Sequence, residues 1–316
     1  MIRLLLLIPL ILFSCTDSSV LPSYTGATNE VLIVIDDALW EGSAGDSLRH
    51  YLGAEVQGIA WSEPQFDMIQ IPQSSFSRFF ETHRNIIIIR PAKQSKVTIK
   101  AEPYAQQQWL SVVEYQKEEH LLSLLGQYAP IFSHRILEEE KSRFWRKKKT
   151  SPNPLIQDKF QLSLSIPKNY TKVLDTSSFV WYEFSPKELE LIQGILVYEI
   201  PPYVPFYSSS LLAARDSVLR LYVPGPSPGS YMTTEYLHYE PYVSSFETPF
   251  AQGFIVKGLW KVEQGFMGGP FLAYFFQDVK RQKTYSIEGF LFNPGQNKRN
   301  VLQEMDWTIS NFKTVP

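Results

Sequence analysis

The chain has 316 residues, a length that usually forms two domains. Hydrophobic residues make up 44% of it and aromatic residues 14%, which is enough to fill packed cores. Its 30 Lys and Arg residues nearly balance 32 Asp and Glu residues, and the formal net charge of −2 argues against nucleic acid as a partner. One cysteine excludes a disulfide within the chain and a site built from several thiolates.

The first seventeen residues contain the clearest functional signal. Arg3 precedes an apolar run over residues 4–13, and Ser14 and Cys15 follow it. The run has the length of a signal-peptide core and is far shorter than the ~20 residues that span a bilayer. A small residue before a lone cysteine is typical of lipoprotein processing, so we predict a signal peptide over residues 1–14 and a lipid anchor on Cys15. The alternative is an incidental cysteine in a cleaved secretory signal.

Residues 15–29 are polar, include Pro22 and Gly26, and predict a short tether. Residues 30–150 predict an N-terminal unit of α/β type. Its expected strands cover residues 31–35, 66–71, 86–89, 97–101 and 109–115. Its expected helices cover residues 38–52, 75–81 and 118–148. The last is expected to have a break or kink near Gly126 and Pro130, because proline interrupts helical hydrogen bonding.

The two prolines between Thr150 and Pro154 predict a domain boundary. Residues 151–316 predict a C-terminal α+β unit rich in antiparallel strands, and Gly268–Pro270 predicts a hairpin turn or bulge. The expected strands cover residues 160–166, 178–184, 191–200, 232–239, 253–262, 271–277 and 285–292, and the helices cover 208–221 and 298–312. The whole chain predicts an α+β fold of two sheet-plus-helix units, with mainly antiparallel sheets and helices packed on one face.

Catalytic motifs are weak in this sequence. Gly45–Leu48 spells the Gly-Asp-Ser-Leu signature of a hydrolase family, but it lies in a helix-forming segment. That family also needs an Asp three residues before a late histidine, and Glu235 precedes His238 instead. No phosphate loop, dinucleotide fingerprint or metal-binding histidine spacing occurs. We therefore assign no catalytic, cofactor or metal residue and expect no cofactor.

Two proline-rich loops flank the helix expected over residues 208–221. Their aromatic side chains Tyr203, Phe206, Tyr207 and Tyr231 are candidate contacts for a protein partner, because stiff aromatic loops suit such interfaces. The alternative is that they are ordinary connections whose aromatic side chains pack inward. A helix of that length extends on the order of 20 Å, so the loops are expected at its opposite ends.

The strongest charge feature is the run over residues 141–149. Arg143, Trp145, Arg146, Lys147 and Lys148 are candidates for a patch that binds anionic lipid headgroups or a polyanionic glycan. The alternative is a solvated helix end, where cations favour the helix dipole and pair with the glutamates at 138–140.

Several short phrases occur together along the chain. They are Thr28–Ile35 with Leu39 and Trp40, Arg84–Ile86, Ser178–Trp181, Gly258–Trp260, Phe266–Phe271, Glu288–Phe290, Pro294–Gly295 and Lys298–Arg299. From about Pro22 to its C-terminus, the chain resembles the Bacteroidota lipoproteins grouped as domain-of-unknown-function family 4837. The resemblance implies an envelope lipoprotein of a Gram-negative bacterium and assigns no functional residue. It favours an outer-membrane protein that faces the periplasm, because only one acidic residue, Asp17, follows the cysteine closely.

These observations predict a non-enzymatic binding or scaffold module of a cell-envelope complex. Its expected partners are the membrane, through the anchor, and an envelope protein. The alternative is a periplasmic carrier or binder of a small apolar or glycan ligand, and a hydrolase is the third possibility. A deep apolar cavity favours the carrier, whereas a filled core with an exposed aromatic patch favours the binding module.

Overall fold

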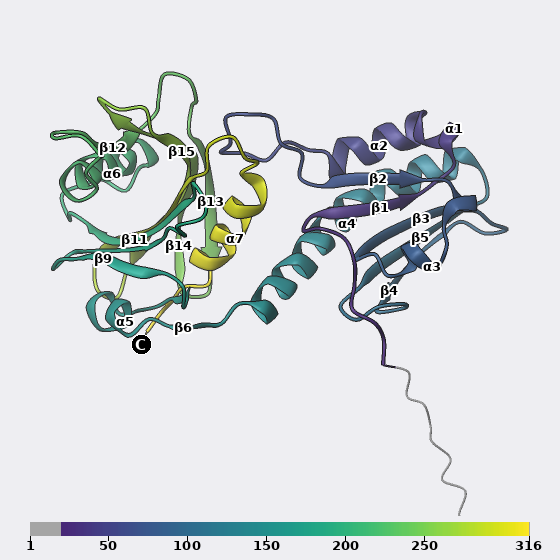
Figure 1. Cartoon of the computed structure of the whole chain (residues 1–316), viewed down its shortest axis with the longest axis horizontal. Helices are drawn as coiled ribbons and strands as arrows, with labels where there is room; N and C mark the ends of the chain where they lie inside the picture. Colours follow the sequence, from purple (N-terminus) through teal and green to yellow (C-terminus); the bar gives the residue numbers. More distant parts are fainter. Residues whose placement is uncertain (1–19, 316) are drawn as a thin grey trace, which may run out of the picture.

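Two sheets, one in each half of the sequence, are joined by the long helix α4 (Glu118–Lys147) (Figure 1). The computed structural model describes residues 20–315, so the predicted signal peptide and Cys15 lie outside the described residues. The predicted α+β class, with mostly antiparallel sheets, is confirmed.

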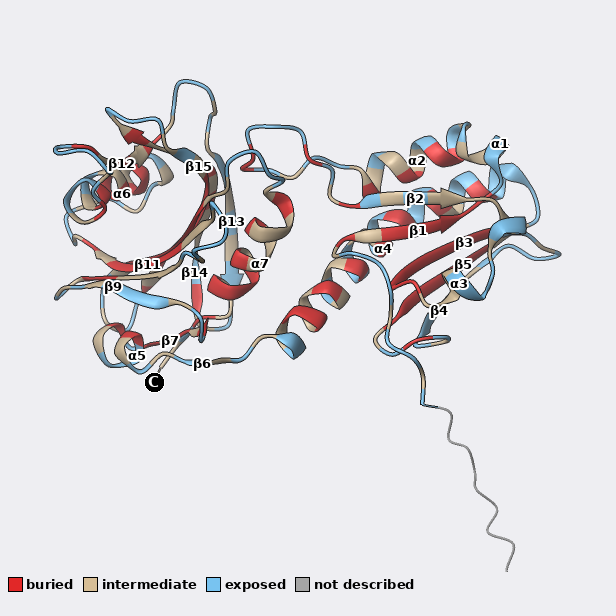
Figure 2. Ribbon diagram, in the orientation of Figure 1, coloured by how far each residue is buried: buried red, intermediate tan, exposed pale blue. Residues whose placement is uncertain are grey.

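The N-terminal sheet has five strands in the order β2-β1-β3-β5-β4. They are β2 (Asp67–Ile71), β1 (Glu30–Val34), β3 (Asn85–Pro91), β5 (Trp109–Tyr115) and β4 (Lys96–Ala101). The first four are parallel, and β4 is an antiparallel edge strand. Unbroken apolar runs suit parallel strands that are buried on both faces, and Figure 2 shows β1, β3 and β5 as mostly buried. Helices α2 (Ser43–Leu52) and α4 cover one face, and η1 (Gln73–Ser75) and α3 (Arg78–Glu81) lie beside the other.

The single helix expected over residues 38–52 is divided at Gly42 into α1 (Asp37–Trp40) and α2. The turn between them brings the carbonyl oxygen of Trp40 against α2. A Cβ atom at position 45 would lie 1.8 Å from that oxygen, so only glycine fits there. The glycine of the Gly-Asp-Ser-Leu sequence therefore has a packing reason.

Helix α4 runs without a break through Gly126 and Pro130, where we expected a break or a kink. A proline inside a helix costs about 3 kcal/mol, because it removes one hydrogen bond and crowds the preceding turn. Five fully buried side chains at helical spacing hold α4 against the sheet and α2: Leu121, Leu125, Ala129, Phe132 and Ile136. Tertiary packing therefore outweighs the local preference for a break.

The C-terminal sheet has eight antiparallel strands. Seven follow the order β12 (Tyr231–Thr234), β14 (Ala251–Glu263), β15 (Gly268–Asp278), β16 (Lys283–Phe292), β11 (Ile192–Ile200), β10 (Phe179–Phe184) and β9 (Thr171–Asp175), and β13 (Tyr242–Thr248) also pairs with β14. Helix α6 (Ser208–Tyr222) covers one face, whereas α5 (Pro154–Phe160) and α7 (Arg299–Ile309) cover the other. Helices thus cover both faces, instead of the one face we expected, because both faces of the central strands are apolar.

Three local predictions in this half are corrected. Residues 160–166 were expected to form one strand. Instead, Phe160 is the last residue of α5, and the short strands β7 (Leu162–Ser163) and β8 (Ser165–Pro167) follow. The Asn153 side chain caps the start of α5, and Gln161 ends the helix in a left-handed conformation. Gly268–Pro270 begins β15, and the turn before it lies at residues 264–267. The strand expected over 232–239 ends at Thr234, and β13 was not predicted.

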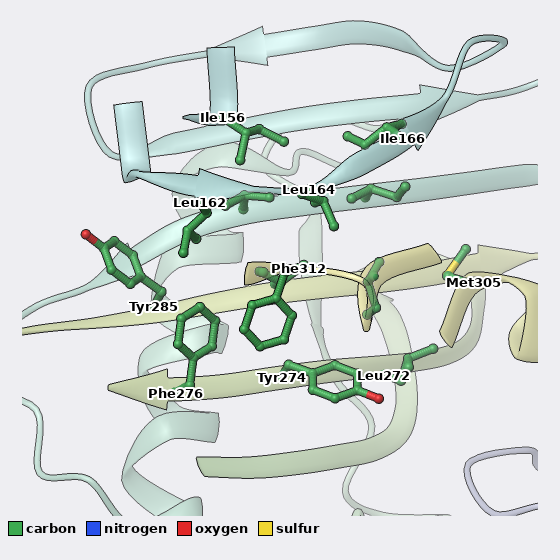
Figure 3. Close-up of a cluster of buried hydrophobic side chains, with 14 of the residues drawn as sticks. Ile156, Leu162, Leu164, Ile166, Leu272, Tyr274, Phe276, Tyr285, Met305 and Phe312 are labelled. Atoms are coloured by element: carbon green, nitrogen blue, oxygen red, sulfur yellow. The ribbon is translucent and has the colours of Figure 1, made fainter. Parts of the chain in front are cut away.

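Aromatic side chains fill the core between the large sheet, α5 and α7 (Figure 3). Phe312, which follows α7, stacks on Phe276 of β15 at a ring-centre distance of 4.5 Å. Tyr274 and Tyr285 lie beside this pair. The short pairs β6 (Thr150–Pro152) with β8, and β7 with β17 (Lys313–Thr314), close this end of the core.

Helix α7 lies between the large sheet and the N-terminal half, and it contacts both (Figure 1). The Glu63 carboxylate accepts hydrogen bonds from the backbone N–H groups of Lys298 and Arg299, at 2.8 Å each. Since a helix N-terminus attracts negative charge, Glu63 fastens the N-terminal half to the start of α7. Trp307 packs against Phe144 of α4, with ring centres 5.5 Å apart.

Candidate functional site

An open cleft of about 510 Å³ lies at the end of the large sheet where β14 turns into β15. We call it the hairpin cleft. Its walls come from the loop before β2, the loop after β12, the β14–β15 turn and the segment that leads into α7. Side chains that line it include Trp61, Glu235, His238, Lys261, Phe266, Met267 and Lys298. Segments far apart in the sequence therefore meet at one surface site.

Contacts on both sides of Trp61 hold its loop in place. On one side, the N–H of Gly58 donates to the hydroxyl of Tyr239 at 2.7 Å. Gly58 has a φ of +92°, and a Cβ atom there would lie 2.9 Å from the Cβ of Lys257, so this close approach requires glycine. On the other side, Glu63 is bound to the start of α7. The Trp61 side chain is nevertheless 64% exposed.

The polar groups of the cleft centre on Glu235. Its Oε1 accepts hydrogen bonds from the N–H groups of Leu237 at 2.6 Å and His238 at 3.2 Å, and its Oε2 lies 3.4 Å from Lys261 Nζ. Desolvation acts to raise the pKa of Glu235, but these hydrogen bonds and the lysine charge outweigh it, so the pKa lies below its usual value. Glu235 is thus an ionised acceptor that organises its own loop, and it is a poor proton donor.

His238, which the sequence did not support as a catalytic base, also lies in this cleft. Its Nδ1 is 3.4 Å from Glu235 Oε1, and its side chain is largely exposed. No serine, threonine or cysteine is among the described residues that line the cleft. The nucleophile that a Ser-His-carboxylate arrangement needs is therefore missing from this wall. Ser47 of the Gly-Asp-Ser-Leu sequence lies on α2, in the other half.

A second, smaller pocket of about 210 Å³ lies on the α6 face of the sheet at the same hairpin. We call it the aromatic pocket. Its lining includes Trp181, Glu183, Met232, Trp260, Phe290 and Phe292, together with Pro224–Pro226 from the loop after α6. Trp260 and Met267 line both sites, so the two are neighbours.

Trp260 is held by a hydrogen bond that a glycine on the adjacent strand makes possible. Its Nε1 donates across β15 to the carbonyl oxygen of Leu291 on β16, at 3.1 Å. A Cβ atom at Gly269 would lie 2.0 Å from that oxygen and 3.3 Å from the indole nitrogen. Gly269 therefore permits the close approach, and Trp260 forms a fixed wall between the two sites.

The two proline-rich loops lie at opposite ends of α6, as expected, and their aromatic side chains do not form one site. Tyr203 and Tyr207 are 83% and 69% exposed and do not line either site, whereas Phe206 packs against Phe254. Tyr231 is half-buried, with the Arg220 guanidinium 5.0 Å from its ring centre. Only the second loop contributes to a pocket, through Pro224–Pro226 and not through its tyrosine.

The predicted basic patch is smaller than expected. Arg143 was wrongly placed on the surface: it is 1% exposed, and its guanidinium donates to Glu140 at 2.8 Å and to Asn85 at 3.0 Å. The helix turns Arg143 inward, where it neutralises the buried carboxylate. Lys148 forms an ion pair with Glu304 at 3.1 Å.

Of the remaining candidates, Lys147 lies near the first described residues. Trp145 is half-buried, whereas Arg146 and Lys147 are exposed. The Lys147 ammonium lies 5.0 Å from the ring centre of Tyr24. Residues 21–25, which we expected to form part of a free tether, are fixed to the body: Gln106 donates to the carbonyl oxygens of Pro22 and Leu21, and the N–H of Thr25 donates to Thr82, each at 2.9 Å.

A buried ion pair below α6 was not predicted from the sequence. Arg215 and Glu288 are both fully buried, and Arg215 Nη2 lies 2.6 Å from Glu288 Oε1. Tyr198 donates its hydroxyl to the same carboxylate at 3.1 Å. A usable signal was present, because Arg215 occupies the apolar stripe of its helix and Glu288 interrupts an apolar strand.

Residues 20–315 contain neither a metal-binding cluster nor a membrane-spanning helix. No group of three or more His, Cys, Asp or Glu side chains there could hold a metal ion. No helix in that part of the chain has both the length and the apolar character to cross a membrane.

The fold and the site define a two-sheet α+β protein with an open cleft beside a small apolar pocket. Residues 148–311 match the family described as domain of unknown function DUF4837, and the chain belongs to that family. Residues 24–147 match a second family, described as domain of unknown function DUF8532. The predicted resemblance to the first family is confirmed, but its match covers only the C-terminal half. A search of curated proteins finds no match to this chain.

Solved structures give only distant likenesses. The Ran-binding protein Mog1p of Saccharomyces cerevisiae has a TM-score of 0.38 and 9% identity, over 54% of this chain and 97% of that chain. A Mog1 mutant has a TM-score of 0.36 and 9% identity, over 54% and 96% of the two chains. LpqN of Mycobacterium tuberculosis, a protein described as involved in cell envelope biogenesis, has a TM-score of 0.27 and 9% identity, over 54% of this chain and 87% of that chain. At these TM-scores the likenesses support no functional argument.

Proposed function

We propose that this protein is a lipid-anchored, non-enzymatic binding module of the cell envelope, and that the hairpin cleft binds its protein partner. The observation that carries this proposal is the exposure of large apolar side chains around one cleft. Phe266 is fully exposed at the tip of the β14–β15 turn, and Trp61, which also lines the cleft, is 64% exposed. Leu237, in the loop between the lining residues Glu235 and His238, is 81% exposed. Aromatic and aliphatic side chains grouped at the rim of a concave surface are typical of interaction sites.

The geometry of the rim suits a protein partner. Burying a side chain such as Phe266 is worth roughly 1.5–3 kcal/mol, which the free protein does not gain. The loop of Trp61 and the loop of Leu237 are held by hydrogen bonds to Tyr239 and Glu235, so little conformational entropy is lost on binding. Lys298 adds a positive charge to the wall and favours a partner with an acidic residue beside its apolar contacts, whereas the charge of Lys261 is balanced by Glu235.

The chemistry of the cleft supports binding over catalysis. Glu235 is held as an ionised acceptor, and His238 has no nucleophile beside it among the described lining residues. A hydrolase with a serine, threonine or cysteine nucleophile would need that group within hydrogen-bond distance of a general base. We therefore rank a hydrolase of this kind below both binding hypotheses.

The envelope location rests on the sequence of the first seventeen residues. We propose that Cys15 bears the lipid and that the protein faces the periplasm from the outer membrane. Cys15→Ala should release the protein from membranes, because about 0.8 kcal/mol per buried methylene is then lost. Metabolic labelling with an alkyne fatty acid and membrane fractionation test this; retention of an unlabelled protein would contradict the anchor.

The partner is tested by site-specific photo-crosslinking of the full-length lipoprotein in intact cells. A benzophenone side chain replaces Phe266 or, in a separate strain, Trp61. The matched control is Val279, which is 73% exposed in the turn at the other end of the same strand, β15. We expect both cleft positions to give the same discrete protein adduct and the control to give none. Equal adducts at all three positions, or none at the cleft, would reject this surface as the interface.

A further inference from the structure

We propose that one face of the N-terminal sheet, the face beside which η1 and α3 lie, contacts the lipid bilayer and inserts the Phe79 side chain among the lipid headgroups. We call it the α3 face. The inference deepens the proposed function and rests on its lipid anchor at Cys15, which brings the bilayer to the protein. It adds which side of the folded body meets the lipid.

The two faces of the N-terminal sheet differ in how completely helices cover them. Helix α2 and the 30-residue helix α4 cover one face. The α3 face has only the three residues of η1 and the four of α3, and Phe76 and Phe80 from this region pack on its apolar strands. Ile69 of β2 pairs with Leu32 of the same apolar face and is 38% exposed. The α3 face is therefore an apolar surface that the protein leaves partly open.

Helix α3 carries one aromatic side chain toward solvent. Phe80 packs against the sheet, whereas its neighbour Phe79 is 80% exposed. The two rings meet edge to face, with 5.1 Å between their centres, so the packed ring supports the exposed one. Protein segments that lie in a membrane interface bury such apolar side chains at the boundary between headgroups and acyl chains. Phe79 is thus suited to a bilayer surface.

The chain enters the body beside α3. Residues 16–20 alone separate the proposed lipidated cysteine from the first fixed residue, Leu21. The carbonyl oxygen of Leu21 accepts a hydrogen bond from Gln106, and the N–H of Thr25 donates to Thr82, which directly follows α3. In Figure 1, α2 lies above the N-terminal sheet and α3 lies below it, toward the first described residues. A lipid on that cysteine therefore places the bilayer next to α3.

The strands of the α3 face carry more cations than carboxylates. Because side chains alternate along a strand, Arg90 of β3, Glu114 of β5, and Lys96 and Lys100 of β4 extend from this face. Arg90 and Lys96 both pair with Glu114, at 2.8 Å and 3.2 Å, so one carboxylate serves two cations. Lys100 and, on α3, Arg78 are exposed. These cations favour a surface of anionic lipid headgroups.

Two nearby carboxylates reduce this charge without cancelling it. Glu81, at the end of α3, is half-buried, and Glu102, directly after β4, accepts a hydrogen bond from the N–H of Gln107. The excess of positive charge is therefore small. We expect the apolar side chain of Phe79 to contribute most of the contact and anionic lipid to strengthen it.

The test measures how deeply single positions of the lipidated protein enter a bilayer. Cys15 is the one cysteine of the chain and bears the proposed lipid, so Phe79→Cys introduces the only free thiol. The apolar fluorophore NBD, attached to that thiol, takes the place of the ring and reports the polarity around it. The full-length lipoprotein is reconstituted into vesicles of phosphatidylethanolamine and phosphatidylglycerol. Matched vesicles also contain lipids with a nitroxide quencher on the acyl chain near the headgroup.

We expect the NBD emission at position 79 to shift to the blue and to be lost in the vesicles with quencher. Ile131→Cys is the matched control, because Ile131 is 41% exposed on α4, which covers the opposite face of the same sheet. Its label should keep the emission it shows in water. Lys100→Cys, a second position on the α3 face, retains Phe79 and should also shift to the blue, so a failure of Phe79→Cys to fold leaves the proposal testable.

Flotation of the vesicles separates this result from the anchor. Protein that bears no lipid by mass and does not float would reject the anchor, and this proposal with it. Protein that floats while the labels at positions 79 and 100 keep their emission in water would overturn the α3 face alone. Equal quenching at positions 79 and 131 would do the same, because it would mean that the body has no fixed orientation on the bilayer.

Discussion

Each half of the molecule buries one glutamate against arginine, but the two clusters differ in composition and in what they hold. In the N-terminal half, Glu140 lies between Arg84 at 2.7 Å and Arg143 at 2.8 Å. In the C-terminal half, Glu288 has one arginine, Arg215, whose guanidinium also lies 3.6 Å from the centre of the Phe271 ring. Both carboxylates are at most 1% exposed.

The neighbours of each cluster show its role. Arg84, Arg143 and Lys147 all lie within 5.3 Å of the ring centre of Tyr24, so the N-terminal cluster binds the segment that enters the body. The C-terminal cluster connects α6 to β16 in the centre of the sheet. Both clusters join a helix to its sheet, α4 to β3 in one and α6 to β16 in the other. Because a buried ion pair is weak evidence for stability, the difference that matters is position: the N-terminal cluster also holds the entering segment.

The largest effect is expected from Arg215→Met. It leaves the Glu288 carboxylate buried without a cation, which should lower the free energy of unfolding by about 3–5 kcal/mol in urea titrations. The double variant Arg215→Met/Glu288→Leu should recover part of that loss, because no charge then remains. A double variant as unstable as the sum of the two single variants would show that the pair is not coupled.

A smaller loss, about 2 kcal/mol, is expected from Glu140→Gln, because the amide oxygen still accepts a hydrogen bond while two arginines lose their counter-charge. Hydrogen exchange should also become faster in residues 21–25. Arg215→Met provides the contrast, since it should leave exchange in that segment unchanged under native conditions. Equal acceleration in both variants would remove the difference in role proposed for the two clusters.

Tyr24→Leu should cost about 1 kcal/mol, because the three cations lose their aromatic partner while the apolar contact partly remains. The amide of Thr25, which donates to Thr82, should lose its protection from hydrogen exchange. Tyr203→Leu is the control, since Tyr203 is 83% exposed and lies in the other half. An unchanged Thr25 amide would mean that the backbone contacts hold the segment without the ring.

The smallest effect concerns pH. Burial lowers the pKa of His83, although a hydrogen bond to Asn85 and the charge of Glu30 act in the opposite direction. A folded-state pKa below the usual 6.5 means that this contribution to stability is complete above that pH and is lost as pH falls through the folded-state value. Urea unfolding between about pH 7.5 and pH 5 measures it. His83→Gln should flatten the dependence over that interval, and an equally steep dependence in this variant would assign it to other groups.

Local patterns predicted much of the fold because they depend on neighbours in sequence. The apolar runs around Ile33 and Ile88 and the stripe of α6 are examples. Predictions failed where distant contacts decide the outcome. Packing of α4 overrides Pro130, and a buried carboxylate draws Arg143 inward although its sequence neighbours are basic.

The candidate site was less predictable for the same reason. The hairpin cleft combines Trp61, His238 and Phe266 from three loops that no sequence spacing connects. The aromatic pocket likewise combines Trp181 of β10, Trp260 of β14 and the loop after α6, which are far apart in the sequence. Glu235, His238, Gly268–Pro270 and the loop at Pro224–Pro226 were singled out beforehand, each for another reason.

The attachment of residues 21–25 limits how far the protein could reach. If Cys15 bears the lipid as proposed, six steps of the chain separate it from Leu21, which extend at most about 20 Å. The folded body would then stay close to the bilayer. A partner of the hairpin cleft must accordingly reach the protein at the membrane or be located there itself.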